Sequence, residues 1–479
     1  MDKMSQKTYV IWGTGEDGKA CYELLNLINA YIPFFVDNNE NLFGKKLFDK
    51  PVLNPEKITE FTDDMILVIG SEDHYAEITK QVREILNGEK IKIVSCTGLF
   101  SDFPEVIYND FIENYISSDA LDREILYDCQ IFSNQIYGGV TRYFEEIING
   151  IAGNYKVDLF KGLNISKAKL SDDVRILFDK NPDNPLYSSA SYRRTYNRLA
   201  LQSAQDNLSR YKIYHPTYYD DYNLNCYEHL VVTVYDMIHE IFDMDPSIIQ
   251  KKKQLVHKAD TIIAISESTK SDIIKYLGVD EKKIKVIYLG NSLRGFDNHE
   301  KPYEFPYILF VGNRGGYKNF ETLINAFSRT SYVNDFHLVC FGGGRFTNNE
   351  LELIQDLKLF DKVGQISGSD SLLAAIYQGA EVFVYPSLYE GFGLPLLEAM
   401  HLGTPVITSC TSSMPEIGGD AALYFDPYSI EDLSNKLELM LTDNELRSTY
   451  SILGQEREKF FSWEKCVYET KLLYDSLIN

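Results

Sequence analysis

Residues 385–400 read YPSLYEGFGLPLLEAM, and this stretch decides how the second half of the chain folds. The run VFVYPS that leads into it has the apolar, β-branched character of a buried strand, and Pro395 suits the first turn of a helix. The loop between them carries two glycines and precedes a helix start, so its amides can approach an anion. Glu390 lies in the loop, and Glu398 lies one turn inside the helix, where it can accept hydrogen bonds from a ribose.

The same order of a short apolar run and a longer amphipathic stretch recurs along the whole chain. The runs that predict buried strands are YVIWG, FFVDN, MILVIG, KIYHPT, LVVTVYD, TIIAIS, YILFVG and HLVCFG. Repeated strand–helix units of this kind predict an α/β fold with parallel sheets covered by helices.

Composition excludes several classes of protein. The chain has 479 residues and a net charge of -23, which disfavours nucleic acid as a partner. Its seven cysteines include no C-x-x-C pair, so we expect neither a disulfide framework nor a zinc site. No apolar run approaches the roughly 20 residues of a membrane-spanning helix, and MDKMSQK leads directly into a strand. We therefore expect a cytoplasmic protein without a signal peptide, a transmembrane segment or a bound metal.

A glycine motif follows the first predicted strand. Gly13, Gly15 and Gly18 fit G-x-G-x-x-G at the start of a helix, and Asp37 ends the next strand. This context is typical of a nucleotide site, with phosphate at the helix N-terminus and the acid on a ribose. Residues 16 and 17 are acidic, however, and would repel a pyrophosphate. Two interpretations stay open: a second nucleotide site, or a turn that needs glycine for packing.

The Glu-x7-Glu segment resembles the motif of the retaining, GT-B-fold glycosyltransferases of family 4. The resemblance runs from about Ile125 to the C-terminus, and further segments agree with the family in order and spacing: Gln135–Val140, Gly312–Arg314 with Lys318–Asn319, Phe341–Gly344 and Pro415–Ala422.

The resemblance implies roles for individual residues. The implied donor-binding residues are Gly139, Arg314, Lys318, Gly391, Phe392, Gly393 and Glu398, and the implied catalytic residues are His215, Asp236 and Glu390. Arg314 would offer a forked donor and Lys318 a point charge to the leaving diphosphate, with no metal required. At a second strand end Tyr235 replaces the family's common histidine, where Asp236 or His239 could serve instead.

Two further segments have alternative interpretations. The stretch 188–210 is locally basic, and Arg193, Arg194 and Arg198 either line the acceptor side or belong to a solvated helix face. Ser266 precedes a predicted helix and is most simply its N-cap.

The predicted architecture is a GT-B body with an additional N-terminal Rossmann-like domain. The expected boundaries are 1–100 for a Rossmann-like accessory domain, 101–124 for a helical connector, 125–298 for the acceptor-side domain, 299–460 for the donor domain and 461–479 for a terminal helix crossing back to the first half. Residues 1–100 resemble the small domain that precedes some bacterial sugar acetyltransferases, and a homo-oligomer could form through it.

The function implied by the resemblance is retaining transfer of a sugar from a UDP- or GDP-linked donor, without a further cofactor. The acceptor would be a hydroxyl of a glycan, a lipid-linked glycan or a protein, in bacterial surface polysaccharide or glycoconjugate synthesis. Alternatives within the fold are a nucleotide-sugar epimerase and a catalytically weak nucleotide-sugar-binding scaffold subunit. A phosphorylase would carry a pyridoxal-phosphate lysine site, which we do not recognise in the sequence.

Overall fold

The computed structural model describes residues 7–60, 65–87, 91–115, 123–180, 185–205, 208, 210–293 and 302–478. The chain contacts divide into two compact units. The first comprises Met1–Thr141 and Ala152–Glu228, and the second comprises Arg142–Ile151 and His229–Asn479. Each unit is described by itself below.

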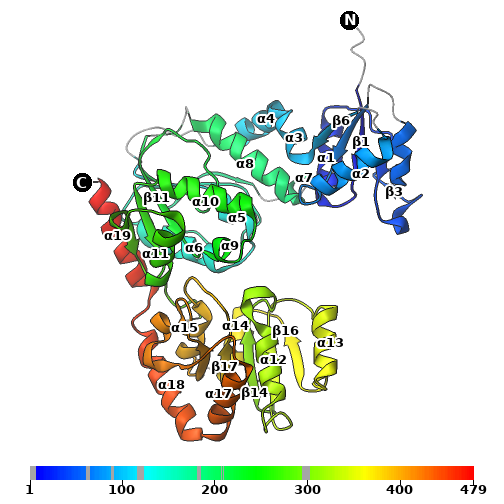
Figure 1. Ribbon diagram of the computed structural model, residues 1–479. Helices are drawn as coiled ribbons and strands as arrows, with labels where there is room; N and C mark the ends of the chain where they lie inside the picture. Colours follow the sequence, from blue (N-terminus) through cyan, green and yellow to red (C-terminus); the bar gives the residue numbers. More distant parts are fainter. Residues whose placement is uncertain are drawn as a thin grey trace, which may run out of the picture. The chain divides into compact units, whose positions relative to one another are not determined.

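The first sheet lies in the first unit and has the strand order β3-β4-β2-β1-β5-β6. Its strands are β1 (Thr8–Trp12), β2 (Phe35–Val36), β3 (Lys46–Leu47), β4 (Lys50–Leu53), β5 (Met65–Ile69) and β6 (Lys92–Ser95). All its pairings are parallel except that of β3 with β4. Alternate residues of β1 and β5 pack against α2 (Tyr75–Leu86), and α1 (Glu16–Leu27) follows the glycine turn (Figure 1).

The rest of the first unit holds four parallel strands in the order β10-β7-β8-β9. They are β7 (Ile125–Tyr127), β8 (Val157–Leu163), β9 (Arg175–Lys180) and β10 (Tyr211–His215). The helices of this part are α3 (Cys96–Ser101), α4 (Pro104–Asn114), α5 (Gln130–Asn134), α7 (Pro185–Ser188) and α8 (Ala190–Ala204). Helix α1 packs against α7, and α3 and α4 pack against α8, so the first sheet is joined to these strands through helices (Figure 1).

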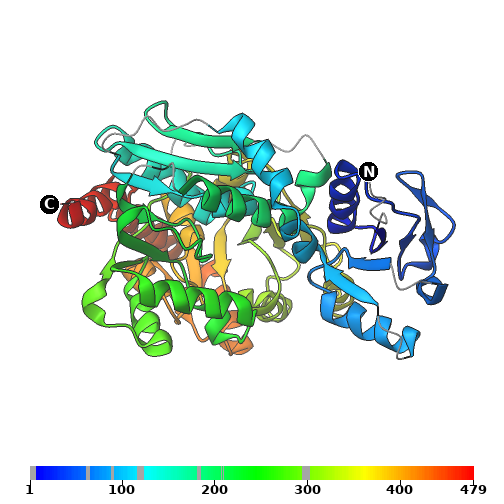
Figure 2. The same ribbon diagram turned by 90° about the horizontal axis from the view of Figure 1, so that it is seen from above.

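The second unit begins with α6 (Gly139–Ala152), which straddles its boundary, and with three parallel strands. The strands are β11 (Tyr227–Val234), β12 (Thr261–Ala264) and β13 (Ile284–Val286), and their helices are α9 (Ile238–Ile241), α10 (Pro246–Lys258) and α11 (Glu267–Asp272). The C-terminal helix α19 (Trp463–Ile478), red in Figures 1 and 2, packs closely on α6. Gly150 of α6 lies so near Val467 of α19 that a Cβ atom on the glycine would be 2.6 Å from the valine side chain.

The last sheet is fully parallel and has the order β16-β15-β14-β17-β18-β19. Its strands are β14 (Tyr307–Val311), β15 (His337–Phe341), β16 (Val363–Ile366), β17 (Val382–Tyr385), β18 (Val406–Ser409) and β19 (Leu423–Phe425). Its helices are α12 (Phe320–Ser328), α13 (Asn348–Asp356), α14 (Asp370–Gly379), α15 (Leu394–His401), α16 (Met414–Gly418), α17 (Ile430–Thr442) and α18 (Asn444–Glu458). Buried side chains fill both faces of the sheet, which explains why its strands read as continuous apolar runs.

The structure confirms the predicted fold class: parallel strands alternate with helices in sheets of the Rossmann type. The expected boundary at residues 298 and 299 lies outside the described residues, as do residues 116–122 of the expected connector. The described part of that connector contains α4.

Candidate active site

The loop between β17 and α15 is held by hydroxyl groups that follow β18. The amide of Glu390 donates to the Ser412 hydroxyl at 2.9 Å. The Ser413 hydroxyl lies 2.9 Å from the carbonyl oxygens of both Glu390 and Phe392. Gly393, at φ +102°, is the N-cap of α15, a conformation that favours glycine. Sequence reasoning missed the two serines, although they directly precede a segment that it had singled out.

Lys318, in the turn after β14, forms an ion pair with Glu390 of this loop, with 2.7 Å between the ammonium and the carboxylate. The phenol oxygen of Tyr385, at the end of β17, lies 3.4 Å from the same ammonium. Asn319 is left-handed at φ +57° and donates from its side-chain amide to the carbonyl of Pro386 at 3.0 Å. The structure therefore brings together two side chains that the sequence placed 72 positions apart.

Glu398 lies on α15 and accepts a hydrogen bond from the Tyr377 hydroxyl at 3.1 Å. Burial raises the pKa of Glu398 to about 7, while the hydrogen bond from Tyr377 acts in the opposite direction. The carboxyl group therefore changes charge close to neutral pH. Tyr377, at the end of α14, was not predicted as a site residue.

The loop also meets two other elements of the second unit. A Cβ atom on Gly391 would lie 1.7 Å from the carbonyl oxygen of Tyr235, so only glycine fits this contact. The Ser266 hydroxyl donates to the Gly391 carbonyl at 2.7 Å, and the Tyr389 hydroxyl donates to Asp272 at 2.8 Å. Ser266 is also the N-cap of α11, as expected. Its bond to the glycine loop was not foreseen.

Asp236 follows β11 and is anchored by a buried lysine. The side chain of Lys252 is fully buried and donates to the Asp236 backbone carbonyl at 2.9 Å and to the Glu240 carboxylate at 2.9 Å. The Asp236 carboxylate lies 4.0 Å from the same ammonium and accepts the amide of Ile238 at 3.1 Å. His239, the other candidate here, lies on α9. Lys252 is a further residue that the sequence interpretation missed.

His215 belongs to the first unit, at the end of β10. It is fully buried, its ring lies 5.5 Å from that of Tyr127, and burial lowers its pKa to about 3. The imidazole is therefore neutral at physiological pH and cannot act there as a cationic acid. The adjacent turn is fixed by the buried Asp128, which accepts the amide of Thr217 at 2.8 Å and the hydroxyl of Tyr214 at 2.7 Å.

Phe392 and the three glycines of the implied donor-binding set have only their backbone available for such contacts. The ring of Phe392 packs against Phe461 with centroids 5.9 Å apart, inside the protein. Gly139 begins α6 in the first unit, in a turn where the Thr141 hydroxyl donates to the Gln135 side chain at 3.1 Å. Donor contacts from Phe392 and Gly139 stay predictions.

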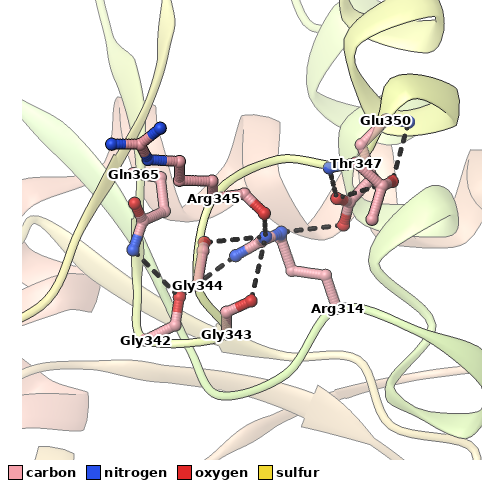
Figure 3. Close-up of polar contacts among 8 residues, drawn as sticks. All are labelled: Arg314, Gly342, Gly343, Gly344, Arg345, Thr347, Glu350 and Gln365. Carbon is pink, nitrogen blue, oxygen red and sulfur yellow. Dashed lines mark hydrogen bonds and ion pairs between the residues drawn. The ribbon is translucent and has the colours of Figure 1, made fainter. Parts of the chain in front are cut away.

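Arg314 follows β14, and its side chain, only 2% exposed, turns to the loop after β15 and to Glu350 (Figure 3). A hollow of about 400 Å³ beside that loop is lined in part by Arg345, Phe346 and Gln365. The Gln365 amide donates to the carbonyl of Gly342 at 3.2 Å.

Helix α8 is mostly buried, and its three arginines differ in exposure. Arg193 is buried and donates to the carbonyls of Tyr187 and Ser188, each at 2.7 Å. Arg193 therefore holds the turn between α7 and α8, and the solvated-face interpretation is wrong for it, because tertiary packing covers this part of the helix. A role on the acceptor side stays a prediction. Arg194 is exposed and Arg198 partly exposed.

Close packing between the turn after β1 and helix α1 accounts for two of the three glycines of the N-terminal motif. A Cβ atom on Gly18 would lie 2.1 Å from the carbonyl oxygen of Gly13, and Gly13 has φ +113°. The Asp37 carboxylate accepts both the amide (2.9 Å) and the hydroxyl (2.7 Å) of Thr14. A Cβ atom on Gly15, by contrast, would meet no atom within 4 Å. A second nucleotide site at these residues stays a prediction.

The acidic start of α1 links the part of the first unit that holds the first sheet to helix α8 by hydrogen bonds. The Asp17 carboxylate accepts the hydroxyl of Ser189, the N-cap of α8, at 2.6 Å and that of Ser191, in its first turn, at 3.1 Å. The acid that would repel a phosphate is thus paired with hydroxyl donors, which a sequence pattern cannot show.

Within the described ranges, no group of three or more His, Cys, Asp or Glu side chains is arranged to hold a metal ion. A search of the same residues finds no helix with the length and apolar character needed to cross a membrane.

Three known families match the chain in succession. Residues 4–94 match the family described as C2185-like, N-terminal, residues 137–293 match Glycosyltransferase Family 4, and residues 294–457 match Glycosyl transferases group 1. The description of the family matched at residues 4–94 does not mention an acetyltransferase, so the acetyltransferase likeness stays an expectation.

Curated proteins and solved structures give related matches. The chain is 28% identical to O-antigen chain mannosyltransferase B of Escherichia coli over 71% of this chain and 96% of the relative. It is 34% identical to the O-antigen chain mannosyltransferase RfbU of Salmonella typhimurium, over 40% of this chain and 56% of the relative. Its fold matches that of Anabaena HepE in complex with UDP and glucose, with a TM-score of 0.57 and 15% identity over 74% of this chain and all of that one. With two glycosyltransferase domains in tandem and structural neighbours of the GT-B class, this chain is a glycosyltransferase of the GT-B fold.

Proposed function

We propose that the chain transfers a sugar, mannose being the first candidate, from a nucleotide-linked donor to a hydroxyl of a growing surface polysaccharide, with retention of anomeric configuration. Both O-antigen relatives named above are mannosyltransferases, which supports the sugar and the class of acceptor. The observation that carries the proposal is the ion pair of Lys318 and Glu390 beside the start of α15.

Each charged group of the candidate site has a part in the proposed reaction. Lys318 carries the positive charge that meets the leaving diphosphate, and the amides at the start of α15 add partial positive charge. Glu390 accepts hydrogen bonds from sugar hydroxyls and orients the sugar, and Glu398 accepts the ribose hydroxyls. Asp236 and His215 complete the proposed catalytic set, His215 as a neutral hydrogen-bonding group because its pKa is lowered to about 3 by burial.

The proposed chemistry is front-face substitution without a metal ion. The acceptor hydroxyl forms its bond to the anomeric carbon on the side from which the diphosphate leaves, and a diphosphate oxygen takes the hydroxyl proton. Positioning and charge stabilisation then supply most of the rate enhancement.

The test is an assay with UDP-, GDP-, ADP- and dTDP-linked sugars, each with and without a mannose-containing polysaccharide fragment. We expect nucleoside diphosphate release and elongation of the fragment only when both substrates are present, unchanged by a chelator, and an α-linked product from an α-linked donor. Release of nucleotide with an epimerised free sugar would support the epimerase instead. Nucleotide-sugar binding without turnover would support the scaffold subunit, and a chelator-sensitive reaction would disprove the metal-free mechanism.

Donor affinity should rise with pH through neutrality. Because burial raises the pKa of Glu398 to about 7, its carboxyl group is mostly protonated at pH 6 and mostly ionised at pH 8. Only the ionised form accepts two ribose hydroxyls, so the dissociation constant should fall by roughly 5- to 10-fold between these values. Calorimetry with the bound nucleoside diphosphate measures this.

The control for the pH effect is Glu398→Gln, which is neutral at every pH and should bind weakly with a flat profile over the same range. A pH profile of the Glu398→Gln variant as steep as that of the unmodified protein would assign the titration to another group.

A further inference from the structure

The Arg314 side chain is enclosed by hydrogen-bond acceptors of the protein itself (Figure 3). Its Nε donates to Glu350 at 2.8 Å. Its two Nη atoms donate to the carbonyl oxygens of four consecutive loop residues: Gly342 (3.1 Å), Gly343 (3.3 Å), Gly344 (3.0 Å) and Arg345 (3.0 Å). Nη1 donates to Gly342 alone, whereas the two N–H groups of Nη2 are shared among Gly343, Gly344 and Arg345. With Nε on Glu350 and only 2% of the side chain exposed, the guanidinium is committed mainly to the protein itself.

The loop that accepts these bonds has a backbone that is costly to order, because its glycines are conformationally free. Gly342, Gly343 and Gly344 all lie in the left-handed region, at φ +85°, +67° and +69°. Three consecutive glycines lose more conformational entropy on ordering than any other residues would. A Cβ atom on Gly343 would also lie 2.8 Å from the Arg314 side chain, so the loop and the guanidinium are fitted to each other.

The far side of Arg314 is anchored to α13. Glu350, which accepts from Arg314, also accepts the Thr347 amide at 2.6 Å and forms the capping box of that helix. The Phe346 ring lies 4.7 Å from the guanidinium carbon. Arg314 is therefore fixed between a helix start and the glycine loop.

We propose that Arg314 is a positioning residue: it shapes the loop 342–345 and acts on the nucleotide only through that loop. In a trans peptide the carbonyl and the following N–H point in opposite directions. Four carbonyls directed at Arg314 therefore direct the amides of residues 343–346 away from it, where successive amides can face the phosphate that nucleoside mono- and diphosphates share. This replaces the direct diphosphate contact that the family resemblance implied, and it leaves Lys318 as the cation for that group. The ligand in this inference rests on the proposed function.

The first test uses the nucleotide-free protein. Arg314→Lys keeps the positive charge but loses the planar fork, so it cannot bond four carbonyls and Glu350 together. We expect its Tm to fall by about 4 °C or more. The matched control is Arg345→Lys, an exposed side chain of the same loop, whose Tm should not change. An unchanged Tm for Arg314→Lys would overturn the positioning role.

The second test compares GDP with GMP, and UDP with UMP, by calorimetry. If Arg314 acts through the loop, Arg314→Lys should weaken the monophosphate and the diphosphate by the same factor, roughly 10-fold. Glu350→Gln, which touches Arg314 but lies on its far side, should weaken both in the same direction by a smaller factor, and the effects in the double variant should not add.

A loss confined to the diphosphate would restore a direct phosphate contact and overturn the proposal. If the unmodified protein binds neither GDP nor UDP, the proposed function fails, whereas the Tm comparison still decides the role of Arg314.

Discussion

Gly391→Ala is expected to lower the rate of sugar transfer by about 100-fold or more. We expect no other added methyl group in the second unit to have a larger effect. The new Cβ atom would lie 1.7 Å from the Tyr235 carbonyl oxygen, about half of a normal contact distance. The backbone of the loop must then move away from β11 and carry the neighbouring Glu390 with it. A displacement of about 1 Å at a reacting group costs roughly 100-fold in rate.

The measurement is kcat and KM for the donor identified in the nucleotide-sugar assay, together with thermal unfolding. Overpacking of this kind also lowers the free energy of unfolding by about 1–3 kcal/mol. The control is Gly153→Ala, since a Cβ atom there would meet nothing within 4 Å. Full activity of Gly391→Ala would show that the close approach to Tyr235 is not required during turnover.

Asp158→Asn should produce the largest loss of stability in the first unit. Asp158 is fully buried on β8 and accepts from the guanidinium groups of Arg123 and Arg175 and from the Tyr211 hydroxyl at 2.6 Å. The hydrogen bond to Asp158 raises the pKa of Arg175. Removing the carboxylate leaves two mostly buried cations without their counter-charge, which costs about 3 kcal/mol.

Chemical denaturation of the full chain measures this loss as a lower midpoint with an unchanged slope. Asp172→Asn is the matched control, because it removes the same charge from an exposed site in the turn before β9. It should change the free energy of unfolding by less than about 0.5 kcal/mol. Equal stability of the two variants would mean that solvent already screens the Asp158 network.

Local sequence pattern was sufficient to predict the order of strands and helices and to single out the loop that precedes α15. Strands buried on both faces read as continuous apolar runs, so β1, β5, β12, β14 and β17 were predicted from their side chains alone. Glu390 and Glu398 were predicted as site residues from the loop and the helix that carry them, and Lys318 from the family resemblance. Their roles stay predictions. The sequence cannot show which partners a charged side chain meets across the fold.

Arg314 illustrates this limit. Its position after β14 was predicted correctly, but its acceptors are backbone carbonyls 28 to 31 residues away, and no side-chain pattern marks a carbonyl. Lys252 and Tyr377 were missed for the same reason, since a single lysine or tyrosine on a helix has no local signal. Asp17 was interpreted as repelling phosphate, whereas its partners are serines 172 and 174 positions away.

By itself, then, the sequence determined the α/β class, the succession of strands and helices and the Glu-x7-Glu loop, because these follow from hydrophobic periodicity and from residues close together in the chain. Only the tertiary structure decided the ion pair of Lys318 with Glu390, the pKa of about 7 for Glu398 and the enclosure of Arg314. Each of these depends on burial and on long-range hydrogen bonds, which exist only after the sheets have packed against their helices.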